Sequence, residues 1–157
     1  MIEEENGYIT RIELKQRGCS PALGSANQES SPALAQCKRE LTEYFAGKRT
    51  EFTISINPIG TPFQMKVWEE LKNINYGEVI SYKELALRIG NPKAVRAVGG
   101  ANSKNPLMIV IPCHRVIGAN GALVGYGGGG TKNKEWLINL EKEAAKNFAC
   151  YNIRERR

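Results

Sequence analysis

Two residues that could do covalent chemistry stand side by side in this chain, Cys113 and His114, within the run Ile111-Pro112-Cys113-His114-Arg115-Val116. His114 is the only histidine among 157 residues. A cysteine reacts as its thiolate, and because the ordinary thiol pKa is ~8.5, a neighbouring base or cation is the usual means of making it nucleophilic near neutral pH. If the chain does covalent chemistry, we expect it at these two residues.

The backbone around Cys113 decides whether the two side chains can cooperate. Consecutive side chains of a strand point to opposite faces, so His114 could reach the sulfur directly only from a turn, or otherwise through a bridging water. Pro112 follows the apolar run 107–111 and favours the turn, because it fixes its own backbone angle and lacks a donor. A buried, inert cysteine beside an exposed histidine is the alternative that these residues alone leave open.

The composition indicates a globular protein with a basic surface. A chain of 157 residues with 41% hydrophobic content forms one domain or two small ones around a real core. The net charge of +6 suggests a polyanionic partner such as nucleic acid, although many basic proteins bind none.

The cysteine content argues against a structural metal site. The four cysteines are widely spaced without a C-x-x-C motif, and one histidine cannot complete a paired zinc signature. There is no apolar stretch of ~18 residues and no signal-peptide pattern. We therefore expect no metal, no membrane association and free thiols in a reducing compartment, the cytoplasm or, in a eukaryote, the nucleus.

The first part of the chain, up to a composition break at 57–60, reads as a small α+β unit. Residues 7–14 alternate like a strand, and a Gly/Ser/Pro-rich loop follows from Gly18 to Ser31. Ser31-Pro32 predicts a helix that ends before Gly47, and the alternation of Phe52, Ile54 and Ile56 predicts another strand.

The second part is predicted to be mostly helical. Thr61-Pro62 caps a helix with an apolar stripe on one face. Ser81 caps a short helix through Arg88, and Asn91-Pro92 starts another that runs to about Ala101. Two short helices joined by a tight turn that contains glycine form a helix-turn-helix.

The second helix of this motif has unusually small side chains around Arg96, namely Ala94, Ala97, Gly99, Gly100 and Ala101. Recognition helices usually carry long polar side chains that read bases in the major groove. Small residues instead let a helix backbone approach closely, which suits the minor groove and sequence-tolerant contact. Packing of this helix against another one is the alternative.

Together these segments resemble one protein family. They occur in the order Tyr82, the helix-turn-helix, Arg96-Ala97-Val98-Gly99-Gly100-Ala101-Asn102, Asn105-Pro106, Ile111-Pro112-Cys113-His114-Arg115-Val116, Gly125-Tyr126-Gly127-Gly128 and Lys134-Glu135-Trp136-Leu137. This order and spacing resemble the O6-alkylguanine-DNA alkyltransferases, densely from about Thr61 to Glu141.

The resemblance implies an α+β fold of two domains. Residues 1–58 would form a small ribonuclease-H-like α/β domain that supports without reacting, with a reduced sheet because the usual strand before residue 7 is expected to be missing. Residues 59–157 would form a mostly helical domain with a winged-helix-like helix-turn-helix.

The resemblance also implies a function. Members flip O6-alkylguanine out of double-stranded DNA and transfer the alkyl group irreversibly to the cysteine, once per molecule. We expect the same reaction here at Cys113, also on O4-alkylthymine, by a monomer that needs no cofactor.

Matching motifs assign expected roles to individual residues. Arg96 would fill the gap left by the flipped base, and Tyr82 would contact the adjacent phosphate and donate to the base. Glu141 would orient His114, which draws the proton from Cys113 through a water. Further expected positions are Ala97, Gly99 and Gly100 at the DNA, Asn105 as the support of the cysteine segment, and Met108, Val116, Tyr126 and Gly127 around the base.

Two of these positions, Gly127 and Met108, depart from the family pattern, and Met108 replaces a proline found in some relatives. Gly127 stands where many members have a serine that donates to the guanine oxygen, which leaves only its backbone N–H. Glu141 is assigned from the register of Lys134-Glu135-Trp136, which follows one extra residue within 127–133.

Three other functions are compatible with parts of this pattern. A damage-binding relative would share the helix-turn-helix and the arginine but lack the cysteine. A cysteine hydrolase would use Cys113 and His114 with turnover. A transcription regulator would need base-reading side chains on the second helix, where residues 92–101 have almost none.

Overall fold

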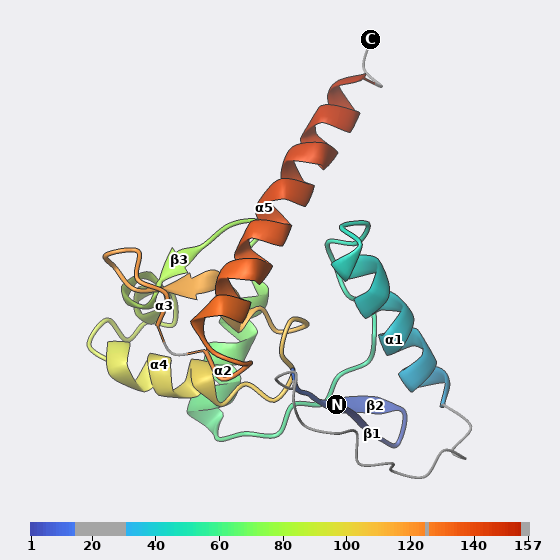
Figure 1. Cartoon of the computed structure of the whole chain (residues 1–157). Coiled ribbons are helices and arrows are strands. Elements are labelled where there is room, and N and C mark those ends of the chain that lie inside the picture. Colours follow the sequence, from blue (N-terminus) through green and yellow to red (C-terminus); the bar gives the residue numbers. More distant parts are fainter. Residues whose placement is uncertain (15–30, 125, 155–157) are drawn as a thin grey trace.

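A computed structural model describes residues 1–14, 31–124 and 126–154, the side chains only as far as 147. The predicted loop from Gly18 therefore lies outside the described residues up to its last residue, Ser31. The elements follow one another as β1 (Ile2–Glu5), β2 (Tyr8–Ile12), α1 (Pro32–Phe45), α2 (Pro62–Lys72), β3 (Ile80–Ser81), α3 (Tyr82–Arg88), α4 (Val95–Ser103), the 3-10 turn η1 (Cys113–Arg115), β4 (Val116–Ile117) and α5 (Thr131–Arg154) (Figure 1).

The N-terminal strands form an antiparallel hairpin. Asn6 and Gly7 turn the chain with φ of 54° and 83°, values that asparagine and glycine tolerate best. β2 buries Ile9 and Ile12. The expectation that no strand precedes residue 7 was wrong, because Ile2–Glu5 alternates in burial and pairs with β2.

The predicted strand around Ile54 is not formed. Residues 52–56 bend at Ile54 and contribute only an isolated parallel bridge between Ile56 and Ile9. The physical reason lies in Glu40 of α1, whose carboxylate accepts the backbone N–H of Thr53 at 2.8 Å. That donor is therefore not available to a neighbouring strand.

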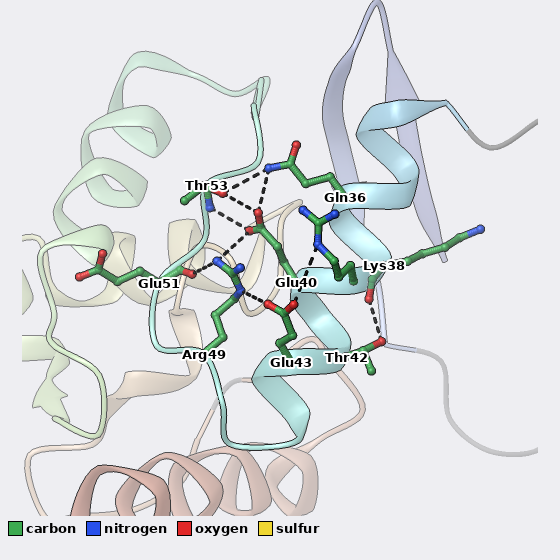
Figure 2. A network of polar contacts seen from close by, with 9 residues as sticks. Gln36, Lys38, Glu40, Thr42, Glu43, Arg49, Glu51 and Thr53 are labelled. Carbon is green, nitrogen blue, oxygen red and sulfur yellow. Dashed lines mark hydrogen bonds and ion pairs between the residues drawn. The ribbon is translucent and has the colours of Figure 1, made fainter. Parts of the chain in front are cut away.

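Glu40 is the centre of a polar network that ties α1 to the segment after it (Figure 2). Its side chain is fully buried and accepts hydrogen bonds from Gln36 at 2.8 Å and from the Thr53 hydroxyl at 2.5 Å. Arg49 lies 3.7 Å away and pairs at 2.7 Å with Glu43. A buried carboxylate is tolerated here because several donors satisfy it.

The helical part begins as predicted. Thr61 and Gln64 form a reciprocal capping box at the start of α2, and Ser81 caps α3 by accepting from the N–H of Glu84 at 3.0 Å. After α3 the chain reverses through Gly90 with φ of 73°. The helix-turn-helix is thus α3 followed by α4.

The second helix starts later than predicted, at Val95 and not at Pro92. Asn91 and Ala94 close a separate turn through a backbone hydrogen bond of 3.0 Å. α4 buries Val98 and Ala101, and Trp68 of α2 donates to the Ala101 carbonyl at 2.9 Å.

One hydrophobic core runs through both parts of the molecule. The backbone of Ile12 in β2 donates to the Pro106 carbonyl at 2.8 Å and accepts from Met108 at 3.3 Å. The N-terminal hairpin thereby contacts the segment that leads to Cys113. Further along the chain, α5 packs its first turns on the core and then extends away from the body (Figure 1). No helix among the described residues has the length and apolar content needed to cross a membrane.

Candidate active site

The cysteine segment forms the turn that Pro112 predicts. The N–H of Cys113 donates to the Ile111 carbonyl at 2.8 Å, and that of Arg115 donates to the Pro112 carbonyl at 3.0 Å. Just before it, Ile109 has φ of 76°, an uncommon value for a β-branched residue. The turn buries Cys113 to 3% exposure and His114 completely, which excludes the alternative of an exposed histidine.

Two buried asparagines hold this segment against the end of α4. The side chain of Asn105 donates to the Ile111 carbonyl at 2.8 Å and accepts from the N–H of Leu107 at 3.0 Å. Asn102 donates to the carbonyl of Cys113 itself at 3.2 Å. Asn105 was expected near this turn, whereas the contact of Asn102 with Cys113 was missed although its motif was recognised.

His114 and Glu141 lie in direct contact, as the register of 134–136 predicts. The His114 Nε2 atom is 2.8 Å from Glu141 Oε1, and both side chains are buried. Burial alone would raise the pKa of Glu141, but hydrogen bonds from His114 and Arg115 outweigh it and hold that pKa at about 2. Glu141 is therefore an ionised acceptor, and Nε2 must be the donor.

The imidazole of His114 is consequently a base at its other nitrogen. Burial lowers the pKa of His114 more strongly than the charge of Glu141 raises it, so the ring is neutral near pH 7. With the proton on Nε2, the lone pair is on Nδ1, which is buried without a hydrogen-bond partner among the described residues. This nitrogen can accept a proton from a nearby thiol.

Glu141 has three further donors that the sequence did not reveal. Arg115 binds both carboxylate oxygens at 2.8 and 2.9 Å, and the N–H of Gly77 donates at 3.1 Å. The hydroxyl of Tyr44, from α1, donates at 2.7 Å. The adjacency of Arg115 to His114 was a usable signal, but Tyr44 is 97 residues away from Glu141 and gave none.

The Cys113 thiol is protonated in the resting protein. Burial raises its pKa, and a hydrogen bond from Asn105 and the positive charge of Lys134 only partly offset that effect. Attack by this sulfur therefore needs a base, and His114 is the adjacent one.

A buried lysine links Cys113 electrostatically to Tyr82. Lys134 Nζ donates to the Val124 carbonyl at 2.9 Å and lies 5.5 Å from the centroid of the Tyr82 ring. The Tyr82 hydroxyl donates to the same carbonyl at 3.0 Å. Burial lowers the pKa of Lys134 to about 8, which leaves it mostly protonated near neutrality. Its place in the sequence predicted the register of Glu141 but not this buried position.

Of the residues expected around the base, Met108, Tyr126 and Gly127 lie close together. A side chain at Gly127 would place Cβ 3.1 Å from the Ser103 carbonyl and 3.7 Å from Met108 Cε. At Gly128 it would lie 2.7 Å from the Tyr126 ring and 2.9 Å from the Met108 sulfur. Val116 is buried in β4, opposite Ile80. Glycines at 127 and 128 therefore let this backbone lie close to Met108 and Tyr126, where a larger residue would collide.

The outer face of α4 matches the expected DNA-binding positions. Arg96, Ala97 and Gly100 are exposed, while Gly99 is half-buried near the Tyr82 ring. A Cβ on Gly100 would meet nothing within 4 Å, so packing inside the protein does not require a glycine there. The helix thus packs through the face that carries Val98 and Ala101, and Ala97 and Gly100 lie with Arg96 on open surface.

Within the described part of the chain, no group of three or more His, Cys, Asp or Glu side chains could hold a metal ion. The chemistry available at this site is that of a thiol, an imidazole base and its carboxylate partner.

Known proteins resemble this chain over nearly its whole length. Residues 62–143 match the 6-O-methylguanine DNA methyltransferase, DNA binding domain family, and residues 1–58 match the ribonuclease-like domain of the same enzymes. Methylated-DNA–protein-cysteine methyltransferases are 46% identical in Bacillus subtilis, covering 93% of this chain and 90% of the relative, and 54% identical in Mycobacterium leprae, covering 90% and 85%. The crystal structure of Mycobacterium tuberculosis OGT in complex with DNA superposes with a TM-score of 0.77 at 40% identity, covering 91% of this chain and 86% of that one. The chain, in which the buried Cys113 precedes a histidine that contacts Glu141, belongs to the methylated-DNA–protein-cysteine methyltransferase family.

Proposed function

We propose that this protein repairs O6-alkylguanine in double-stranded DNA by transferring the alkyl group irreversibly to Cys113. The observation that carries the proposal is the buried turn in which Cys113 precedes a neutral imidazole whose Nε2 is held by an ionised Glu141 at 2.8 Å. The family relationship supplies the substrate class, since the relatives are named for methylated DNA and a cysteine acceptor.

In the proposed reaction, the thiol proton passes from Cys113 to Nδ1 of His114 through a bridging water. The sulfur then attacks the alkyl carbon, a C–S bond forms and the C–O bond to guanine breaks. The imidazolium that results is stabilised by Glu141 through Nε2. A thioether has no ionisable proton and is a poor leaving group, so each molecule reacts once.

The leaving guanine must receive a proton or a hydrogen bond. Tyr82 is the donor we propose, and its O–H now points to the Val124 carbonyl at 3.0 Å. It would turn from this carbonyl to the base. The buried cation of Lys134 beside the Tyr82 ring favours the negative charge that develops as guanine departs.

The DNA would be bound through α4 in the minor groove. The net charge of +6 favours a polyanion, and the exposed small residues let the helix backbone approach the groove closely. Arg96 would occupy the gap left by the flipped nucleotide, because a planar guanidinium can stack and donate hydrogen bonds at once. Flipping costs a few kcal/mol, which such contacts must offset.

The pocket composition suggests which adducts are accepted. Met108, Tyr126 and Gly127 form a wall in which the methionine side chain is flexible, so we propose that methyl adducts, on guanine O6 and on thymine O4, are substrates. Only the backbone N–H of Gly127 is available to the guanine oxygen.

The free buried thiols fit a reducing compartment, which we propose is the cytoplasm or the nucleus.

Duplex DNA carrying radiolabelled O6-methylguanine tests the proposal. We expect one label per molecule, found on Cys113 by peptide mass spectrometry, and Cys113→Ala should bind the duplex without taking label. Cys37→Ala is the matched control, because Cys37 is a second buried free thiol whose pKa burial raises to about 11. Binding without label would indicate a damage sensor, and repeated product release would indicate a hydrolase.

A further inference from the structure

A tyrosine of the N-terminal domain reaches the candidate catalytic residues of the other domain. Tyr44 lies in the last turn of α1 and is fully buried. Its hydroxyl donates to Glu141 Oε1 at 2.7 Å and lies 3.4 Å from His114 Nε2. The region that matches the ribonuclease-like domain ends at residue 58, whereas Glu141 and His114 lie in the region that matches the DNA-binding domain.

The hydrogen-bond pattern assigns a direction to this contact. Glu141 is ionised and can only accept, so the proton on the Tyr44 oxygen points to Oε1. Burial, followed by the nearby charge of Glu141, raises the pKa of Tyr44, so the hydroxyl stays protonated and remains a donor throughout the physiological range.

Both Tyr44 and His114 donate to the same carboxylate oxygen. Oε1 receives the Tyr44 hydroxyl, His114 Nε2 and one N–H of Arg115 at 2.9 Å. The Tyr44 oxygen itself lies 3.4 Å from Nε2, so the two groups sit side by side on Oε1. The position of Oε1, and with it the orientation of the imidazole, depends on all three donors.

Packing holds the Tyr44 hydroxyl in this place. Its ring contacts Phe45 and Phe52 with centroids 5.5 Å apart in each case, and Tyr76 edge-on at 6.0 Å. An aromatic side chain fixed on every side loses little entropy when its hydroxyl bonds, which is what a positioning group requires.

We infer that Tyr44 is a positioning residue for the proton transfer, supplied by the N-terminal domain. It fixes Glu141 Oε1 and so keeps the base nitrogen Nδ1 of His114 directed away from the carboxylate. This inference rests on the proposed function. It gives the N-terminal domain a part in the reaction, where the sequence analysis expected it only to support the fold.

The test is Tyr44→Phe, which keeps the ring and removes the donor. A hydrogen bond to a charged group contributes enough that its loss should slow alkyl transfer about ten- to hundredfold in single-turnover assays. The loss should be equal with O6-methylguanine in duplex DNA and with free O6-benzylguanine, and affinity for undamaged duplex should not change. With one donor fewer, more of the Glu141 charge acts on His114 and favours its protonated form, so the acid limb of the rate profile should move to higher pH.

Tyr76→Phe is the matched control. The Tyr76 hydroxyl is buried in the same aromatic cluster but makes no hydrogen bond among the described residues, so its removal should leave the rate and the pH profile as in the wild type. In a Glu141→Gln background, Tyr44→Phe should cause little further loss, because its effect passes through Glu141.

Three results would overturn the inference. The first is a wild-type rate and pH profile for Tyr44→Phe. The second is a loss of alkyl-transfer rate in Tyr44→Phe that equals the loss in Tyr76→Phe and leaves the pH profile unchanged. The third is full additivity of the rate losses of Tyr44→Phe and Glu141→Gln. Wild-type protein that left Cys113 unmodified would be a different failure, since it would overturn the proposed function and this inference with it.

Discussion

The guanidinium of Arg115 binds both oxygens of the Glu141 carboxylate, at 2.8 Å from Nε to Oε2 and at 2.9 Å from Nη2 to Oε1. Arg115 follows His114 directly, so one short turn of backbone delivers both the imidazole and the cation to the same carboxylate. The two-point contact fixes the plane of Glu141 and leaves Oε1 facing His114. The histidine is therefore oriented by its neighbour in sequence through a residue of α5.

Replacing Arg115 should destabilise the protein strongly. Arg115→Met leaves a buried carboxylate without its cation, which costs about 3–5 kcal/mol. Arg115→Lys keeps the charge but cannot bind both oxygens in one plane, so we expect an intermediate loss. Urea unfolding of both variants measures this. Equal stability of Arg115→Met and wild type would contradict the contact geometry.

Acid should lower the free energy of unfolding over two separate pH ranges. The folded pKa of Glu141 is about 2, below the ordinary value of 4.5, so its contribution, on the order of 3 kcal/mol, is complete above pH 4.5 and is lost as pH falls toward 2. The pKa of His114 is also lowered by burial, below its ordinary value of 6.5, so its contribution is complete above pH 6.5 and declines below it.

Unfolding free energies measured between pH 2 and 8 check both ranges. Histidine is the side chain whose ordinary pKa lies near this range, and His114 is the only one in the chain. A decline in the free energy of unfolding between pH 6.5 and 5 therefore reports on His114. Glu141→Gln should flatten the part below pH 4.5. A wild-type curve with constant stability from pH 7 to 3 would refute both assignments.

Arg96 should matter for duplex DNA and not for the chemistry. Its side chain is exposed on α4. We expect Arg96→Ala to slow the reaction with O6-methylguanine in a duplex about tenfold or more, which is the size of effect that loss of one stacking contact gives. The reaction with free O6-benzylguanine should stay within about twofold of the wild-type rate. Equal losses on the two substrates would contradict the role. Arg96→Lys should rescue affinity through charge but not the rate of repair.

Gly100 should be replaceable for folding but not for DNA binding. Since a Cβ there meets nothing within 4 Å, Gly100→Ala should stabilise α4 by roughly 0.5–1 kcal/mol through helix propensity. Gly100→Gln should also fold, yet weaken duplex affinity by holding the helix backbone away from the groove. Thermal unfolding and fluorescence anisotropy with a labelled duplex separate the two effects. Unchanged affinity of the glutamine variant would show that this face does not touch DNA.

Glu40 should contribute to stability without contributing to the reaction. Glu40→Leu removes the acceptor of the Thr53 N–H and hydroxyl, at a cost of about 1–3 kcal/mol in all, because Thr53 is exposed and water can replace part of that acceptor. Glu43→Gln is the control, because Glu43 is partly exposed and its ion pair with Arg49 is worth about 0–1 kcal/mol. Alkyl transfer per folded molecule should be unchanged in both. A slower rate for Glu40→Leu at full folding would contradict this separation.

Much of the helical part could be predicted because its signals are local. The caps at Thr61 and Ser81 and the reversal at Gly90 depend on residues within one turn of each other, and the structure has these features where the sequence predicts them. Pro112 likewise identified the turn that holds Cys113. The start of α4 was predicted three residues early because a local turn precedes it, but the error at residues 52–56 came from a distant partner. Residues 52–56 form no strand because the carboxylate of Glu40, in α1, accepts the backbone N–H of Thr53.

The sequence by itself identified the residues of the candidate site, which are Cys113, His114 and, through the register of Lys134, Glu141. Only the tertiary structure decided how these groups are charged, since burial and partners set the neutral imidazole of His114 and the ionised carboxylate. It also decided that Tyr44, from the first domain, donates to that carboxylate. The physical reason is that a motif records side chains close in sequence, whereas pKa values and hydrogen-bond partners depend on every group the fold brings within a few ångströms.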